Sequence, residues 1–178
     1  MKELFKIDLK DYKDTDRHFK RPSVRGIILA EDGKIALVYS KIYRYFKFPG
    51  GGIKEDEDKI QALVREVSEE VGMKVIPSSI IEFGSVLRLQ KSNYEENTVF
   101  EQENFYYFCK VEDSIGKQTL DDYEKDAGFE LRIVDIDYAV KINSECKCED
   151  FFDQIMVDRE RKVLEMLHLL FKKNEQTA

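Results

Sequence analysis

The sequence has few of the features that mark membrane or secreted proteins. Its unbroken apolar runs are short, such as Phe105 to Cys109, whereas a membrane-spanning helix needs about 18 apolar residues. The N-terminus is charged at nearly every other position and lacks the apolar stretch of a secretory signal. These absences predict a cytoplasmic protein with no membrane partner.

Basic residues are outnumbered, and cysteine and histidine are scarce. The 36 acidic and 29 basic side chains give a formal net charge of -7, which disfavours a protein that binds long nucleic acids by neutralising phosphates. The cysteines are Cys109, Cys146 and Cys148, and the histidines are His18 and His168. A Cys-x-Cys pair with so few histidines is a poor zinc pattern. We therefore expect reduced thiols.

The chain also lacks the signs of a domain boundary. It has three prolines, no repeat and no low-complexity tract, so no linker divides it. Its 178 residues have room for one domain of ordinary size. We predict a single domain over residues 1–178, with an N-terminal segment at 1–20 and a C-terminal helix at 151–173.

Hydrophobic periodicity predicts strands interleaved with helices. Val24–Leu29 and Ile35–Tyr39 are rich in β-branched residues and flank an Asp32-Gly33 turn, which indicates a hairpin. Other segments are expected as strands at Leu4–Leu9, Ile80–Leu89, Phe105–Val111 and Leu131–Val134, a loop at Asp11–Lys20 and a short helix near Asp137–Ile142. This order favours an α/β fold in which a mixed sheet is sandwiched between helices.

Two longer segments have helical periodicity. The first runs from about Asp58 to Val71 and stops at Gly72. Its apolar stripe contains Ile60, Leu63, Val64, Val67 and Val71. The second runs from Phe151 to Lys172, and its apolar face contains Phe152, Ile155, Met156, Val163, Leu167, Leu170 and Phe171. This second helix either caps the domain or pairs with a second copy, which would make a homodimer.

The first helix carries an unusual group of acids. Glu66, Glu69 and Glu70 have i, i+3 and i+4 spacing, where like charges cost a few tenths of a kcal/mol each. Acids in the last turn also oppose the helix dipole. A solvated acidic face is the simple explanation. However, the glycines at 50–52 precede the helix, and such a turn can present carbonyls to a hard divalent ion that carboxylates also bind. Together they indicate a metal-phosphate site.

These residues match a known pattern. Gly51, Glu57 and the run Arg65-Glu66-Val67-Ser68-Glu69-Glu70-Val71-Gly72-Met73 match every fixed position of the Nudix box, G-x5-E-x7-R-E-U-x-E-E-x-G-U, where U is a bulky aliphatic residue. The chain therefore resembles the Nudix hydrolases over residues 51–73, with weaker likeness from about Arg21 to Asn143. The resemblance implies an α/β/α sandwich, and Mg²⁺- or Mn²⁺-dependent hydrolysis of the diphosphate bond in a nucleoside diphosphate linked to another moiety.

The resemblance also implies roles for individual residues. Glu66, Glu69 and Glu70 would be metal ligands, with the Gly50 carbonyl as a further one. Arg65, catalytic together with these glutamates, would orient a carboxylate, most plausibly that of Glu57. Gly51, Glu57 and Gly72 would support the site structurally.

Other candidates lie outside the box. The cations expected to meet phosphates are Arg21, Arg25, Arg44, Lys47, Lys54 and Arg88. Glu124 and Glu130 are candidates for an additional base or ligand from a later loop. The chain departs from common family members at two places. It has Lys54-Glu55-Asp56-Glu57 where they have Glu-x-Gly-Glu, and Ile133 where they have Trp. Both departures bear on the choice of substrate more than on activity.

Two alternatives to hydrolysis stay open. A Nudix-like sensor would bind a nucleotide without cleaving it, although such modules typically lose box carboxylates that this chain keeps. An isoprenoid diphosphate isomerase would need a reactive cysteine, for which Cys109 is the candidate. Nucleotide sugars, dinucleotides and nucleoside triphosphates, oxidised or not, all stay open as substrates.

Overall fold

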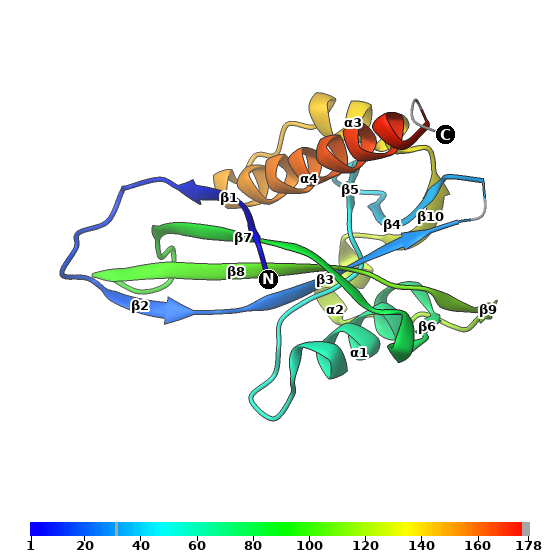
Figure 1. Ribbon diagram of the computed structural model, residues 1–178. Helices are drawn as coiled ribbons and strands as arrows, with labels where there is room; N and C mark the ends of the chain where they lie inside the picture. The colour runs from blue at the N-terminus through cyan, green and yellow to red at the C-terminus, as the bar shows by residue number, and fades with distance from the viewer. Residues whose placement is uncertain (31, 176–178) are drawn as a thin grey trace.

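A mixed β-sheet forms the middle of the structure, and helices lie against both of its faces (Figure 1). The computed structural model describes residues 1–30 and 32–175. The predicted α/β fold with a sheet between helices is confirmed. The single domain over residues 1–178 stays a prediction. Its last three residues, 176–178, lie outside the described residues.

The main sheet combines parallel and antiparallel pairs. Its strands are β1 (Glu3–Asp8), β2 (Arg17–Lys20), β3 (Ser23–Leu29), β4 (Ile35–Ser40), β5 (Tyr45–Lys47), β7 (Ile81–Lys91), β8 (Thr98–Phe108) and β10 (Phe129–Val134). They follow the order β1-β7-β8-β3-β4-β10, with β2 also beside β8 and β5 beside β4. The pairs β1/β7, β2/β8 and β3/β8 are parallel. A separate two-stranded sheet joins β6 (Met73–Val75) to β9 (Val111–Ile115).

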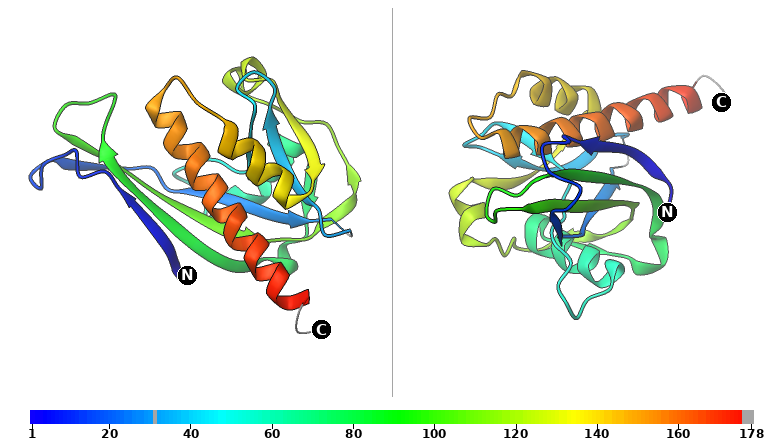
Figure 2. Two further views of the ribbon diagram at one scale, coloured as in Figure 1. Left: turned by 90° about the horizontal axis from the view of Figure 1, so that it is seen from above. Right: turned by 90° about the vertical axis from the view of Figure 1, so that its left-hand side faces the viewer.

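Four helices complete the fold within the residues that the structure describes. They are α1 (Lys59–Val71), α2 (Asp122–Asp126), α3 (Ile136–Glu145) and α4 (Phe151–Glu175), with a 3-10 turn at Pro77–Ser79. Figure 2 shows α3 and α4 packed together over one face of the sheet, with α1 on the other. The described residues include no helix that combines the length and the apolar character needed to cross a membrane.

The helix α1 begins and ends where the sequence predicts. The Asp58 carboxylate accepts the backbone N–H groups of Ile60 and Gln61 at 2.8 Å, and the Gln61 side chain accepts the Asp58 N–H at 2.9 Å. This capping box satisfies N–H groups that lack helical partners. Leu63, Val67 and Val71 are fully buried, as expected of the stripe, whereas Ile60 lies at its exposed margin.

One glycine in the sheet lets α1 approach closely. A Cβ atom on Gly26 of β3 would lie 3.0 Å from Cγ2 of Val67 and 3.6 Å from Cδ1 of Leu63. Both of these side chains of α1 are fully buried. The absence of a side chain at Gly26 therefore sets how near the helix packs.

The opposite face of the sheet is covered by α3 and α4. Val163, Leu164 and Leu167 of α4 are fully buried against a cluster that includes Ile27 and Phe48. Leu170, expected on the apolar face, is 39% exposed. In this structure α4 therefore caps the sheet, which is one of the two arrangements that its sequence allows.

Some predicted segments need correction. The predicted hairpin and the longer strands are confirmed, with Ile28 opposite Ala36 across the hairpin. The predicted loop at Asp11–Lys20 is wrong at its end, because Arg17–Lys20 forms β2 beside β8. The predicted strand at Phe105–Val111 is the end of β8 followed by the start of β9. The short β5, β6 and α2 contain too few residues to show a periodic pattern.

Candidate active site

The segment Phe48–Gly52, here called the glycine loop, connects β5 to the loop before α1. Gly50 has φ = 144°, and a Cβ atom there would lie 2.1 Å from the Val24 carbonyl oxygen. Only glycine fits this position. The backbone of β3 holds the loop, since the Gly26 N–H donates to the Pro49 carbonyl at 2.8 Å and the Val24 N–H to the Gly51 carbonyl at 3.0 Å.

Arg65 gathers three carboxylates around one guanidinium. Its Nη1 donates to Glu66 at 2.7 Å and to Glu69 at 2.9 Å. Its Nη2 donates to Glu57 at 2.8 Å and to the Gly52 carbonyl at 3.1 Å, and its Nε also donates to Glu57. The expected contact between Arg65 and Glu57 is thus present, and it lowers the pKa of Glu57 to about 2.

Glu70 lies deeper than the other acids. It is 1% exposed, and its carboxylate accepts the Lys47 ammonium at 2.5 Å and the Gly50 N–H at 2.8 Å. Burial raises the pKa of Glu70, and the charge of Lys47 opposes that shift. Glu70 therefore ties the C-terminal end of α1 directly to the glycine loop.

Arg25 of β3 reaches the glycine loop from the sheet. One of its terminal nitrogens donates to the Gly50 carbonyl. The side chain is buried, and its Nε has no hydrogen-bond partner among the described residues. Because a buried N–H without a partner is costly, Arg25 is a group that gains from an added acceptor, such as a phosphate oxygen.

The carboxylate cluster, Glu57, Glu66, Glu69 and Glu70, is balanced in part by this chain's own cations. The spacing of Glu66, Glu69 and Glu70 predicts that a positive charge from outside the chain balances them. Arg25, Lys47 and Arg65 instead supply three positive charges within it. In the described part of the chain, no three His, Cys, Asp or Glu side chains are already arranged around a common metal position.

The donors nevertheless fit a hard divalent cation in kind. Carboxylate and carbonyl oxygens are the ligands that Mg²⁺ and Mn²⁺ prefer, and Glu66, Glu70 and the Gly50 carbonyl would supply them. Burial raises the pKa of Glu66, and the charge of Glu70 adds to that effect. An added positive charge would stabilise both carboxylates, provided that Lys47 and Arg25 give up their present contacts.

Of the two later glutamates, only Glu124 lies near this group. Glu124 is buried, and its carboxylate accepts the Asp121 N–H at 2.8 Å as part of the α2 cap. Burial and the charges of Glu70 and Glu124 raise the pKa of the neighbouring Tyr123, which indicates that α2 lies close to Glu70. A short helix from the later loop therefore brings Tyr123, whose hydroxyl contacts Glu124, within electrostatic range of Glu70.

Glu130 lies on the other face of the sheet. Its neighbours Phe129 and Leu131 pack in the core beneath α1, so the alternation of β10 directs Glu130 away from α1. There it pairs with Lys41 at 3.2 Å and with Arg132. The structure thus separates the two candidate bases.

The remaining candidate cations lie in different parts of the structure, and two of them are away from the glycine loop. Arg88 is fully buried elsewhere, where it donates to Gln90 at 2.7 Å and stacks on the Phe152 ring. Arg44 lines a separate cavity beside Cys146. Arg21 and Lys54 are exposed near the glycine loop, and the Lys54 N–H donates to Glu57 at 3.2 Å.

A buried ion pair in α4 was not among the candidate residues. Arg159 and Glu160 are at most 1% exposed, and Glu160 accepts the backbone N–H of Phe48, at the start of the glycine loop, at 2.8 Å. The sequence contains a signal for it. Glu160 lies four residues after Met156 and three before Val163, so it falls on the apolar face of the helix, where a charge needs a partner.

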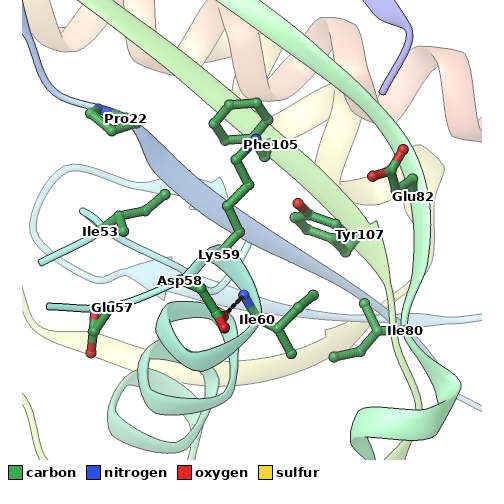
Figure 3. A pocket seen from close by; sticks show the side chains of 10 residues that line it. All are labelled: Pro22, Ile53, Glu57, Asp58, Lys59, Ile60, Ile80, Glu82, Phe105 and Tyr107. Carbon is green, nitrogen blue, oxygen red and sulfur yellow. Dashed lines mark hydrogen bonds between the residues drawn. The ribbon is translucent and has the colours of Figure 1, made fainter.

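A cavity of about 790 Å³ lies along α1 but on another flank. Figure 3 shows Lys59 extending toward the Phe105 ring, and its ammonium is 3.5 Å from the ring centroid. Ile60 lines this cavity. Glu69, nine residues later, is rotated about 180° around the helix from Ile60. The cavity and the carboxylate cluster share Glu57 but lie on opposite sides of α1.

Comparisons with known proteins agree with this geometry. A sequence model of the NUDIX domain matches residues 19–164. An RNA pyrophosphohydrolase of Teredinibacter turnerae is 48% identical over 63 residues, which are 34% of this chain and 35% of that protein. An 8-oxo-dGTP diphosphatase of Buchnera aphidicola subsp. Schizaphis graminum is 40% identical over 57 residues, 30% of this chain and 43% of the relative. These matches span less than half the length of either relative.

A solved structure has a similar fold. The NUDIX hydrolase from Nitrosomonas europaea superposes with a TM-score of 0.53 at 20% identity, over 79% of this chain and 89% of that one. At this level of identity the likeness shows the fold alone. The matched sequence segments carry the further likeness to individual enzymes.

Proposed function

The chain belongs to the NUDIX family, and from this membership we propose that it is a divalent-metal-dependent hydrolase. It cleaves a diphosphate bond in a nucleoside diphosphate linked to another moiety. The relatives named RNA pyrophosphohydrolase and 8-oxo-dGTP diphosphatase support cleavage of a phosphoanhydride. The proposed cofactor is Mg²⁺ or Mn²⁺.

One observation carries this proposal. All four box carboxylates meet the glycine loop or the arginine that contacts it: Arg65 holds three of them, and Glu70 is buried against Gly50. A carboxylate cluster beside the glycine loop suits the binding of divalent cations and, through these cations, of phosphate groups.

The residues of the chain have separate tasks in this proposal. Glu66, Glu69, Glu70 and the Gly50 carbonyl would hold the divalent ion, and such an ion would supply neutralisation of phosphoryl charge and a more acidic water molecule. Arg65 fixes the orientation of the glutamates through its hydrogen bonds. Arg25 and Lys47, released from Gly50 and Glu70, donate to phosphate oxygens of the substrate.

Glu124 is the proposed general base from outside the box. It is buried beside the cluster, and its second oxygen has only a 3.4 Å contact with the Tyr123 hydroxyl, which leaves that oxygen free to accept a proton from water. Glu130 is a poorer choice because it is paired with two cations on the far face of the sheet.

The two alternatives have less support. A sensor that does not hydrolyse its ligand needs none of the box carboxylates, and this chain retains all of them. An isomerase needs a reactive thiol, but Cys109 is buried beneath α1, just beyond the end of β8, and burial raises its pKa to about 12. The thiolate needed for such chemistry is therefore scarce at neutral pH.

A metabolite screen tests the proposal. Diphosphate-containing metabolites, 8-oxo-dGTP and an RNA with a terminal phosphoanhydride are incubated with the protein and Mg²⁺ or Mn²⁺, and the products are identified by mass. We expect release of a nucleoside monophosphate or of phosphate. If no compound is cleaved with either ion while the protein remains folded, the proposed function is wrong.

A pair of variants links the activity to the site. Glu69→Gln, chosen because Glu69 is partly exposed, is expected to lower turnover at least about a hundredfold without unfolding the chain. Glu55→Gln, an exposed acid in the preceding loop, is the matched control and should keep wild-type turnover. Near-normal rates in Glu69→Gln would remove Glu69 from the site.

A further inference from the structure

The strand β5 has one edge that no other strand covers. Among the strands of the described residues it pairs with β4 alone, through Val38 opposite Lys47 and Ser40 opposite Tyr45. On its other edge, side chains of α3 and α4 take the place of a strand. The amide of Asn143 both accepts the Phe46 N–H at 2.7 Å and donates to the Phe46 carbonyl at 2.8 Å. The next outward N–H, that of Phe48, donates to Glu160.

Glu160 makes this contact from a closed, fully buried network. Its Oε2 accepts the Phe48 N–H at 2.8 Å, and its Oε1 accepts the Tyr106 hydroxyl at 3.0 Å and Arg159 Nη2 at 2.8 Å. Arg159 also donates to Gln102 at 3.0 Å. Burial alone would raise the pKa of Glu160, but Arg159 and Arg25 outweigh it and lower that pKa.

A buried pair of this kind adds little to folding stability. Replacing such a pair by apolar residues of similar size is often neutral or stabilising, because taking two charges from water is costly. The contact with Phe48 suggests a different use. Phe48 begins the glycine loop, and the Gly50 N–H, two residues later, contacts Glu70.

The glycine loop is thus held from two sides. From the sheet, β3 contacts the carbonyls of Pro49 and Gly51. From α4, Glu160 contacts the N–H of Phe48. Without Glu160, the loop would be free to shift at its first residue, and the carbonyl of Gly50 would shift with it.

We propose that Glu160 is a positioning residue for the hydrolysis. It fixes the glycine loop from α4, so that the Gly50 carbonyl and the Glu70 carboxylate keep a constant geometry. This inference rests on the proposed function for its effect on turnover, but its effect on the loop does not depend on any substrate.

Two double variants separate positioning from folding. Arg159→Met with Glu160→Gln removes both buried charges but keeps an oxygen that accepts the Phe48 N–H. Arg159→Met with Glu160→Met removes the charges and the acceptor. Glu165→Gln, on the exposed side of the same helix, is the control and should match the wild type in every measurement.

Hydrogen exchange and kinetics are the two measurements. In the methionine pair, amide exchange across residues 46–52 should be at least about tenfold faster than in the glutamine variant, since one anchoring hydrogen bond is lost. Its kcat should be at least about tenfold lower with a smaller change in KM, because misplaced groups slow the reaction itself. Equal exchange and equal kcat in the two double variants would overturn the proposal.

A third test uses the wild-type protein, so it does not depend on whether a variant folds. The Phe48 amide should exchange as slowly as the slowest amides of the sheet, since its acceptor is fully buried; rapid exchange there would overturn the proposal. A failure of the proposed function looks different: the wild-type protein would cleave no diphosphate, while the exchange difference between the double variants would remain.

Discussion

The molecule contains two groups in which an arginine contacts glutamate, and their environments are opposite. Around Arg65, the guanidinium is 19% exposed and Glu69 is 39% exposed, whereas Arg159 and Glu160 are at most 1% exposed. In the second group each oxygen of Glu160 has at least one donor from the chain itself. The first group has an exposed side from which a ligand can reach it.

The difference in exposure suits the group around Arg65 to ligand binding and the Arg159–Glu160 pair to structural support. The carboxylate cluster can exchange partners, because its acids outnumber the contacting cations and part of it faces solvent. The α4 pair is complete and cannot accept a ligand without unfolding its surroundings. Both nevertheless contact the glycine loop, one at Gly50 and Gly52 and the other at Phe48. Substitutions in the two groups should therefore differ mainly in their effect on stability.

The largest effect is expected from breaking the closed pair. Arg159→Met leaves Glu160 buried without its cation, which should lower the free energy of unfolding by about 3–5 kcal/mol. Urea unfolding followed by circular dichroism measures this. A loss below about 1 kcal/mol would mean that water reaches Glu160 and that the two groups are not as different as the structure indicates.

An intermediate effect is expected at the buried edge of the carboxylate cluster. Lys47→Met leaves Glu70 with the Gly50 N–H as its hydrogen-bond donor, and the carboxyl group can take up a proton. We expect a loss of about 2 kcal/mol in the free energy of unfolding at neutral pH. The same urea experiment, with Lys41→Met as an exposed control, checks the value. No loss would show that Lys47 is dispensable for burying Glu70.

The smallest effect, and one that depends on pH, is expected at Arg65. Contact with Arg65 lowers the pKa of Glu57 from 4.5 to about 2, so this contact stabilises the fold above pH 4.5 and loses its effect as the pH falls toward 2. Arg65→Met should therefore cost about 1–2 kcal/mol near neutral pH, after allowance for solvent screening, and less in acid.

Unfolding at a series of pH values measures this difference. Arg161→Gln removes an i, i+4 contact with Glu165 on the surface of α4 and is the matched control, with an expected cost of at most about 0.5 kcal/mol. A difference between wild type and Arg65→Met that stayed constant down to pH 2 would assign the stabilisation to a group other than Glu57.

Patterns among neighbouring residues predicted the helices and strands whose ends are fixed by those same residues. The helix α1, its Asp58 start and its end at Gly72, and the β3–β4 hairpin follow from spacing, capping and turn residues. The strand β2 depends on a neighbour about 80 residues later in the chain, so no local signal marks it. The strand β5 pairs with the nearby β4, but its three residues are too few to show a periodic pattern.

The acids of the site and Arg65 were predictable together with their arrangement, whereas Arg25 and Lys47 were named as candidate cations without their contacts. The box motif identified Glu57, Arg65 and the three helical glutamates, because their spacing is fixed within one segment. That Arg25 and Lys47 contact Gly50 and Glu70 depends on how β3 and β5 approach α1. Glu160 comes from an element about 110 residues after the loop that it holds, and the charge on an apolar helix face was its one sequence signal.

The close packing of α1 on Gly26 affects the position of the site residues as well as the packing of the core. Any larger residue at position 26 would push against Val67, and Glu66 and Glu70 lie on the same rigid helix, one residue before it and three after it. Even a single methyl group in the centre of the sheet would thus crowd the helix that holds both acids beside the glycine loop. The range of side chains that this buried position tolerates is consequently limited by the reaction as well as by the fold.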